Sequence, residues 1–224
     1  MDQMTDRFPK NNLLFRGMSE QERADCLEAL ATGTKTYQKD ELILLAGDVT
    51  DRLGMVLSGS VTIETNDVWG NCTILSHVGT GQVFAETYAL LPGEVLLVDV
   101  RANEDCEIGF VRVGWMLREK APVATWAEKF QRNLLQITAQ KNLALSGRSF
   151  HTAPKSVRGR VLSYLNAMSL QNRSTEFDIP FDRQQLADYL NLDRTSLSKE
   201  LGRMKREGII QCRKNHFRLL KGEE

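Results

Sequence analysis

The amino-acid sequence predicts an α+β protein with three successive parts: a roll of short strands, one long helix, and a helical unit that ends in a hairpin. Two changes of pattern support this fold class. Residues 34–113 alternate apolar and polar side chains in short segments separated by glycines, which is typical of β-strands. From Pro122 to Thr152 there is no further proline and apolar residues recur at helical spacing, and the chain beyond Pro154 reads mainly as helix.

Length and composition indicate a globular protein with two cores. A chain of 224 residues is long enough for two domains, and 42% hydrophobic with 26% charged residues is ordinary for soluble proteins. No apolar run approaches the roughly 18 residues of a membrane span, and Met1–Lys10 lacks the apolar stretch of a signal peptide. We therefore expect a cytoplasmic protein without a membrane partner.

The four cysteines, Cys26, Cys72, Cys106 and Cys212, are widely separated and form no C-x-x-C pair. This spacing does not predict a zinc or iron–sulfur site, although four cysteines can still meet in space. Buried, reduced thiols are the expected state, and no metal site is assigned.

The zero net charge hides a division along the chain. Residues Met1–Gly147 contain 14 Lys and Arg against 20 Asp and Glu, whereas Arg148–Glu224 contain 15 against 9. A basic carboxy-terminal third suggests that this part of the chain faces an anionic polymer. Because charge runs are often only solvated surface, the suggestion requires a motif to support it.

Within the first part, Ser19 and Glu22 form a capping box that predicts a short helix with Leu27 and Leu30 on its apolar side. The strands that follow should alternate between a buried and an exposed face. Two sets are expected on opposite faces: apolar Met55, Leu57, Val61 and Ile63, against polar Ser58, Ser60, Thr62 and Glu64.

The long helix carries a seven-residue repeat, which is the pattern of a helix that lies along a partner helix. The predicted dimer seam consists of Val123, Phe130, Leu134, Ile137 and Ala144. Lys141 interrupts it, and Leu135 and Leu145 offer an alternative register one residue further on. The other interpretation is an ordinary buried helix that belongs to a single domain.

The most specific pattern in the sequence lies between Phe181 and Ile210. Asp182 and Gln185 form a second capping box, Asn191 suits the left-handed conformation of a tight turn, and Asp193 can cap the next helix, which Gly208 ends. The second helix should bury Leu197, Leu201 and Met204 and expose Arg194, Thr195, Ser198, Lys199 and Gly202.

Two short helices joined by a tight turn, with a basic outer face, predict a helix-turn-helix whose second helix fits the DNA major groove. A plain helical hairpin is the alternative. After Ile210 the chain alternates again and turns at Lys214-Asn215, which predicts a hairpin, or wing. Arg213, Lys214 and Arg218 on this wing can reach phosphates.

The order of roll, long helix and winged helix-turn-helix resembles the Crp/Fnr family of bacterial transcription regulators over nearly the whole chain. The firmest matches are Gly59-Ser60-Val61, Phe84-Ala85-Glu86, and Asp182 to Met204. The resemblance implies a cyclic-nucleotide-binding-like β-roll for effector sensing (1–120), a dimerisation helix (121–152) and a winged helix-turn-helix DNA-binding domain (153–224).

The resemblance also implies partners and site residues. It implies a homodimer on double-stranded DNA with an inverted-repeat site, and it leaves RNA polymerase open as a further partner. Base reading would fall to Arg194, Thr195, Ser198 and Lys199, and a phosphate contact to Arg183. Glu200 departs from the aliphatic residue that many relatives have at this position.

The expected effector pocket departs from the pattern of cyclic-nucleotide-binding relatives. Those relatives carry Gly-Glu and then Arg-Ser-Ala; here Glu86 matches the ribose-binding glutamate, but Ala85 precedes it and Leu96-Leu97-Val98 replaces the phosphate anchor. A cyclic phosphate would lose its charge-assisted partner and meet apolar side chains. We therefore expect an effector other than cyclic AMP, small and partly apolar, and Glu86 can instead be a structural carboxylate. The predicted lining is Phe84, Glu86, Leu96, Leu97 and Phe130.

Other sensing chemistries are judged by their ligands. The oxygen-sensing relatives need an amino-terminal cysteine cluster, and Met1–Asp25 contains no cysteine. A haem cofactor stays open because His77 lies in the roll and one axial ligand can suffice, although a hydrogen-bonded histidine is the simpler interpretation. The cofactor is therefore unknown.

Two other function classes are weighed against a DNA-binding regulator. A cupin-like metal enzyme needs several converging histidines or carboxylates, and the roll contains only His77, while no nucleophile–base pair or phosphate-binding glycine loop is visible. A cyclic-nucleotide-type sensor module that does not bind DNA is disfavoured by the helix-turn-helix. We expect no enzymatic activity.

Overall fold

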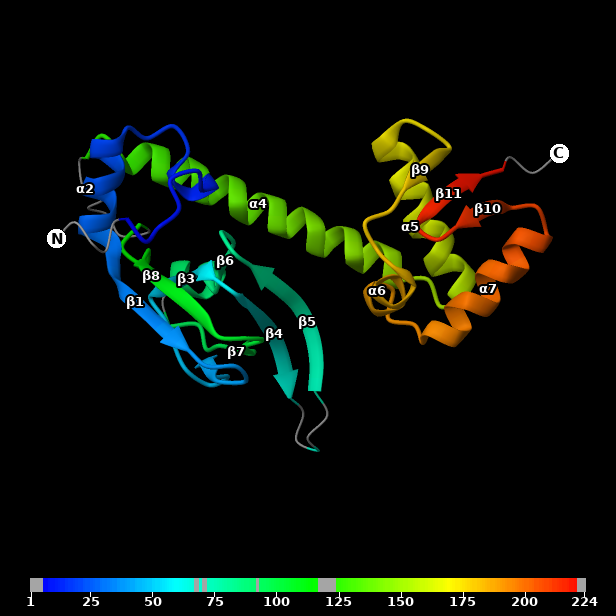
Figure 1. The fold of residues 1–224 in the computed structure, drawn as a ribbon, viewed down its shortest axis with the longest axis horizontal. Coiled ribbons are helices and arrows are strands. Elements are labelled where there is room, and N and C mark those ends of the chain that lie inside the picture. Colours follow the sequence, from blue (N-terminus) through cyan, green and yellow to red (C-terminus); the bar gives the residue numbers. More distant parts are fainter. Residues whose placement is uncertain (1–5, 67–68, 70–71, 92, 117–123, 221–224) are drawn as a thin grey trace. The chain divides into compact units, whose positions relative to one another are not determined.

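The computed structural model describes residues 6–66, 69, 72–91, 93–116 and 124–220 and divides the chain into two compact units, Met1–Ala139 and Gln140–Glu224 (Figure 1). We call them the roll unit and the winged unit. The long helix contributes to both units, whereas the sequence predicts it as a separate segment. Among the described residues, no helix is long and apolar enough to cross a membrane.

The roll unit is built on two four-stranded sheets in which all neighbouring strands are antiparallel (Figure 1). The first has the order β1-β8-β3-β6 and the second β2-β7-β4-β5. The strands are β1 (Ala31–Tyr37), β2 (Leu42–Leu44), β3 (Arg52–Ser58), β4 (Ser60–Asn66), β5 (Cys72–Gly79), β6 (Val83–Phe84), β7 (Asp99–Ala102) and β8 (Cys106–Arg112).

The strand β3, in the interior of the first sheet, is buried on both faces. Met55 and Val56, neighbours on β3, are each fully buried, but they belong to different clusters of the core. The cluster around Val56 takes residues from both sheets and fills the space between them. The cluster around Met55 joins the other face of the sheet to helices, so the roll unit has two apolar layers rather than one.

The predicted alternation of the strands was wrong in two respects. Met55 and Val61 do not share a face, because the chain crosses between the two sheets at Gly59, whose φ of 76° and distance of 2.8 Å from an added Cβ to Cys106 Cβ require glycine. Thr62 and Glu64, expected on the exposed face, are buried. Glu64 is tolerated there because it accepts a hydrogen bond from Arg101 at 2.8 Å.

Short helical elements cover the roll. The helix α2 (Glu20–Leu30) begins with the predicted capping box, since Glu22 N donates to Ser19 Oγ and Ser19 N donates to a Glu22 carboxylate oxygen. Leu27 and Leu30 are buried, as predicted. A 3-10 turn, η1 (Leu13–Phe15), precedes α2, and the short α3 (Glu86–Leu90) follows β6.

The long helix α4 (Ala127–Thr152) ends at the predicted residue but begins later than predicted. Pro122 and Val123 lie outside the described residues, and a turn at Ala124–Trp126 precedes the helix. Trp126 is buried edge-on between Trp115 and Phe130, with ring centroids 6.1 and 6.4 Å away. This packing fixes the chain just before its first helical turn.

The winged unit confirms the predicted helix-turn-helix and hairpin (Figure 1). Its sheet has the order β10-β11-β9 and its core unites residues from every element of the unit after α4. The elements are α5 (Val157–Asn172), β9 (Glu176–Asp178), α6 (Arg183–Tyr189), α7 (Arg194–Arg206), β10 (Ile210–Arg213) and β11 (His216–Leu219).

Candidate nucleic-acid interface

The two helices of the helix-turn-helix begin at the predicted caps. Asp182 accepts a hydrogen bond from Gln185 N at 2.8 Å and returns one to the Gln185 side chain at 2.9 Å. Asp193 accepts from Ser196 N at 2.7 Å, and the hydrogen bonds from Ser196 hold the pKa of Asp193 below its usual value. Asn191 adopts the left-handed conformation between them, with φ of 51°.

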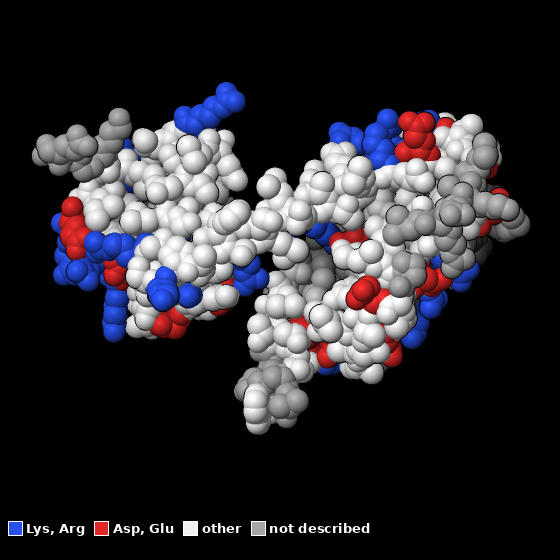
Figure 2. Space-filling view, turned by 180° about the vertical axis from the view of Figure 1, so that it is seen from behind, with Lys and Arg blue, Asp and Glu red and all other residues white. Residues whose placement is uncertain are grey.

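The helix α7 separates a buried face from an exposed one. Leu197, Leu201 and Met204 are at most 3% exposed and join the core of the winged unit. All five residues predicted for the outer face are exposed: Arg194, Thr195, Ser198, Lys199 and Gly202. Figure 2 shows basic side chains along the edge of the winged unit where α7 lies. A polar, basic helix face without a packed partner is what the major groove accepts.

Two arginines bind the turn before α7, and neither was predicted from the sequence. Arg148, near the end of α4, donates to Tyr189 O, Asp188 O and the Asn191 side chain, each at 3.2 Å. Arg160, from α5, donates to Leu190 O at 3.2 Å and to Asn191 O at 2.8 Å. Cations at the carbonyl end of α6 satisfy groups that the helix leaves unpaired. No local pattern marks these arginines, because their partners lie 30 or more residues away.

A third arginine lies behind α7. Arg158 of α5 donates from Nε to Glu200 at 2.6 Å and pairs through Nη1 with Glu207 at 2.7 Å. Glu207 also pairs with Arg203 at 2.9 Å. The Arg158 hydrogen bond lowers the pKa of Glu207, and the two carboxylates raise the pKa of Arg158. The unusual Glu200 is therefore part of an ion-pair network.

The wing carries exposed Arg213 and Lys214. Lys214 lies in the turn with φ of 54°, and its carbonyl accepts a hydrogen bond from Arg183 at 3.2 Å. The Arg183 guanidinium also lies 5.6 Å from the centre of the Phe217 ring. Arg183, predicted to contact a phosphate, thus also connects α6 with the wing turn.

On β11, His216 lies between two carboxylates. Its ring nitrogens are each 3.0 Å from a carboxylate oxygen, Nδ1 from Asp178 and Nε2 from Glu176. These hydrogen bonds, the one to Asp178 first, raise the pKa of His216. The pairs join β11 to β9 across the wing sheet.

The predicted dimer seam faces the protein's own roll, which corrects its assignment. Phe130, Leu134 and Ile137 are at most 8% exposed and belong to the same cluster as Leu14 and Leu27. Two polar groups of α4 bind the same region: Lys129 pairs with Glu22 at 2.6 Å, and Asn133 donates to the carbonyls of Leu14 and Arg16 at 3.1 and 2.8 Å. Of the remaining predicted seam residues, Ala144 is exposed and Val123 lies outside the described residues.

The exposed side of α4 instead carries the alternative register. Leu135 is 69% exposed, Leu143 74% and Leu145 67%. At 100° per residue, Leu135 points away from Phe130 and Ile137, and Leu143 and Leu145 lie about 80° to either side of Leu135.

The predicted effector residues do not line one cavity. Phe84 packs between the two sheets, whereas Phe130 belongs to the other cluster of the core. Leu96 is buried and Leu97 is 73% exposed. Glu86 is buried as the first residue of α3, directly after Ala85, whose φ of 59° is left-handed.

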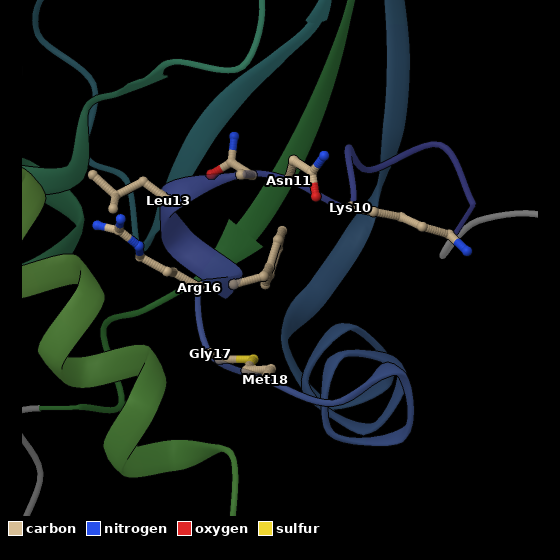
Figure 3. Close-up of a pocket in the computed structure, with 8 residues that line it drawn as sticks. Lys10, Asn11, Leu13, Arg16, Gly17 and Met18 are labelled. Atoms are coloured by element: carbon tan, nitrogen blue, oxygen red, sulfur yellow. The ribbon is translucent and has the colours of Figure 1, made fainter.

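A surface hollow of about 540 Å³ lies elsewhere in the roll unit, around η1 (Figure 3). Lys10, Asn11, Leu13 and Arg16 are among the residues that line it, and none of the predicted effector residues does. The hollow is formed by a single stretch of chain, Lys10–Met18.

The cysteines and the histidine of the roll unit lie in structural rather than metal-binding surroundings among the described residues. Burial raises the pKa of Cys26 to about 12 and also raises that of Cys106. His77 Nδ1 is 2.9 Å from the Thr62 hydroxyl. Over the described part of the chain, no group of three or more histidine, cysteine, aspartate or glutamate residues is placed to hold a metal ion.

A roll followed by a winged helix-turn-helix, with a basic face on its second helix, defines a DNA-binding transcription regulator with an effector-binding domain. Two family models match the chain in the same order: the cyclic nucleotide-binding domain over residues 34–117 and the Crp-like helix-turn-helix domain over residues 159–224. The protein belongs to the Crp/Fnr family of transcription regulators.

Individual relatives are distant. The transcriptional activator protein FnrL of Cereibacter sphaeroides is 22% identical over 189 residues, which cover 79% of this chain and 71% of the relative. The catabolite activator protein of Thermus thermophilus is 22% identical over 94% of each chain, with a TM-score of 0.51. CprK in complex with OCPA is 14% identical over 90% of this chain and 91% of its own, with a TM-score of 0.61. These structures share the fold.

Proposed function

We propose that the protein is a homodimer that reads an inverted-repeat DNA site with α7 and responds through its roll to a small, partly apolar effector other than cyclic AMP. The exposed basic face of α7 carries this proposal, because every residue predicted to read bases is exposed while the opposite side of the same helix is buried. A role as a transcriptional activator, which is the role of FnrL, would add RNA polymerase as a partner.

Base reading and phosphate contact are assigned to different residues. Lys199 and Arg194 carry long donors that suit guanine O6 and N7, and Thr195 and Ser198 make shorter contacts. Arg183, Arg213 and Lys214 lie at α6 and the wing, where contacts to phosphates fix the register without reading sequence.

The test is a binding selection from randomised duplexes with full-length variants. Lys199→Ala should cost about 1–3 kcal/mol at the best site and relax the preference at one base position in each half-site. Lys214→Ala should weaken all sequences alike and reduce the salt slope by about one. Lys205→Ala is the control, since Lys205 is an exposed lysine near the carboxyl end of α7, whereas the amino-terminal residues of a recognition helix contact base edges. An unchanged motif with Lys199→Ala would contradict the assignment of α7 as the reading helix.

The dimer is assigned to the exposed face of α4 around Leu135, with Leu143 and Leu145 on its flanks. A two-fold dimer presents two copies of α7, so the operator should be an inverted repeat with half-site centres about 34 Å apart. An apolar helix face of this kind is a common interaction surface, and the second copy of the chain supplies a matching face.

We assign the effector site to two loops, one around Gly47 and Asp48 and one around Leu96, where relatives have their phosphate anchor. Gly47 N donates to Leu96 O and Leu96 N donates to Asp48 O, each at 2.8 Å, and these hydrogen bonds join the two loops. Apolar side chains on the loops are exposed: Val49 at 57%, Val95 at 44% and Leu97 at 73%. Such a surface favours an apolar ligand over a cyclic phosphate.

Calorimetry tests the effector assignment. Titration with cyclic AMP should give no saturable heat at micromolar concentrations, because no arginine stands at the anchor. Saturable binding would contradict the proposal. A compound that copurifies with the protein, identified by mass spectrometry, would name the effector. Sensing by a thiolate at Cys26 is disfavoured, because a thiol with a pKa of about 12 stays protonated at neutral pH.

A further inference from the structure

The ion-pair network behind α7 joins that helix to α5 at two points. Arg158 contacts Glu200, in the middle of α7, and Glu207, directly after its last residue. Residues seven apart lie on the same side of a helix, two turns from each other. The network is partly shielded from water, because the side chains of Arg158 and Glu200 are 31% and 16% exposed.

Stability alone is a poor explanation for this network. Arg158 Nη2 is buried and has no hydrogen-bond partner among the described residues, so the arrangement leaves one donor unsatisfied. Shielded ion pairs are weak evidence for stability, since apolar side chains of similar volume often serve equally well. A planar guanidinium held by two carboxylates differs from an apolar contact in one respect. It restricts the orientation of the two helices as well as the distance between them.

The position of Glu200 connects this restriction to DNA. Glu200 directly follows Lys199 in the sequence, and one helical residue corresponds to a rotation of about 100°. Any rotation of α7 that moves Glu200 away from Arg158 also turns Lys199 and Arg194 by the same angle.

We propose that Arg158 is a positioning residue for DNA reading, which sets the rotation of α7 by holding Glu200 and Glu207 and so contributes to sequence specificity without contacting DNA. The inference rests on the proposed function, in which α7 is the reading helix. It explains why an acidic residue occupies a position that faces α5.

The experiment measures sequence preference rather than stability. Full-length wild type, Arg158→Met, Arg158→Lys and Glu200→Gln are each passed through the randomised-duplex selection. Their affinities are then measured for the selected site and for an unrelated duplex. Arg158→Met should reduce the ratio of specific to non-specific affinity about tenfold, the range of one mismatched base pair, and broaden the motif at the base read by Lys199. Arg158→Lys should lose less, because one ammonium group can still pair with one carboxylate.

Thermal unfolding of every variant shows which ones are folded at the temperature of the assay. Arg158→Lys keeps a donor for the carboxylates, and Glu200→Gln keeps an acceptor for Arg158. These two variants provide the test if Arg158→Met does not fold. Arg173→Met is the matched control, since Arg173 is exposed and follows α5. The inference is overturned if folded Arg158 variants keep the wild-type motif and affinity ratio while Lys199→Ala changes the motif. If Lys199→Ala also leaves the motif unchanged, the proposed reading helix fails as well.

Discussion

The helix α7 of the winged unit buries its apolar side chains on one face, whereas the strand β3 of the roll unit buries them on both faces. Leu197 of α7 is buried and Lys199, two residues on, is exposed. In the roll, Met55 and Val56 are both buried, and they contribute to separate clusters. In a helix with one exposed face, the sequence pattern separates the residues that can bind a partner from the residues that pack in the core. In a strand that is buried on both faces, the pattern identifies core residues only.

The helix α4 brings the same contrast into a single element and gives the largest expected effect. Phe130→Ala should lower the free energy of unfolding of the roll unit by about 3–5 kcal/mol, because Phe130 is fully buried. Arg132→Ala, on the same helix and also within the roll unit but exposed, should change it by less than about 0.5 kcal/mol. Hydrogen exchange of amides in β3 and β8 measures the roll separately from α7. If the two substitutions lowered the free energy of unfolding equally, the distinction between a buried and an exposed face of α4 would be wrong.

The second prediction concerns the exposed face of α4. Leu135→Glu should weaken the dimer by about 2–4 kcal/mol, since it places two like charges opposite each other, and it should leave the fold of each chain intact. Gln136→Glu adds the same charge one residue away and should have little effect. Light scattering over a concentration series gives the dissociation constants. An unaltered dimer with Leu135→Glu would place the interface elsewhere.

The third prediction compares two residues in the left-handed region, one in each unit. Ala85 has φ of 59°, so Ala85→Gly should stabilise the roll unit by about 0.5–1 kcal/mol. Asn191→Gly should gain less or lose stability. Asparagine tolerates this conformation, and its side chain accepts a hydrogen bond from Arg148. Urea unfolding of both variants measures the difference, and a destabilised Ala85→Gly would show that Ala85 is unstrained.

The smallest effect is a pH dependence confined to the winged unit. The raised pKa of His216 means that its contribution is complete below the usual histidine pKa of about 6.5 and is lost as pH rises through the folded value. Burial lowers the pKa of His151, so stability is lost as pH falls from about 6.5 through that lower value. The unfolding free energy should therefore be highest near pH 6.5.

His216→Gln separates the two histidines. Urea unfolding of this variant over a pH series should show no histidine-dependent loss above pH 6.5 and should retain the loss below it. Arg218, 3.9 Å from Glu176, keeps a positive charge beside that carboxylate at every pH tested. A loss above pH 6.5 that survives His216→Gln would assign it to another group.

Local signals in the sequence predicted local structure well. The caps at Ser19, Asp182 and Asp193, and the turn at Asn191, were all predicted because their partners lie within three residues. The core of α7 followed from helical periodicity for the same reason.

Contacts between distant segments were not predictable in this way. A seven-residue repeat is the same whether a helix packs on its own roll or on a second copy, so the pattern could not decide which face Phe130 occupies. The partners of Arg148 and Arg158 lie about 40 or more residues away and leave no local trace. Leu96 and Leu97 predicted the loss of a phosphate anchor, but only the fold revealed that one is buried and the other exposed.

The aromatic stack before α4 makes the roll unit optically distinct. All three tryptophans, Trp69, Trp115 and Trp126, precede residue 140, so intrinsic tryptophan emission originates in the roll unit alone. Trp126 is 4% exposed and Trp69 84%, so a soluble quencher should extinguish the second and spare much of the first. The elements proposed to contact DNA, α6, α7 and the wing, contain no tryptophan. A change in the shielded emission on adding DNA would thus record, without any label, a signal that travels from the DNA-reading unit to the sensing one.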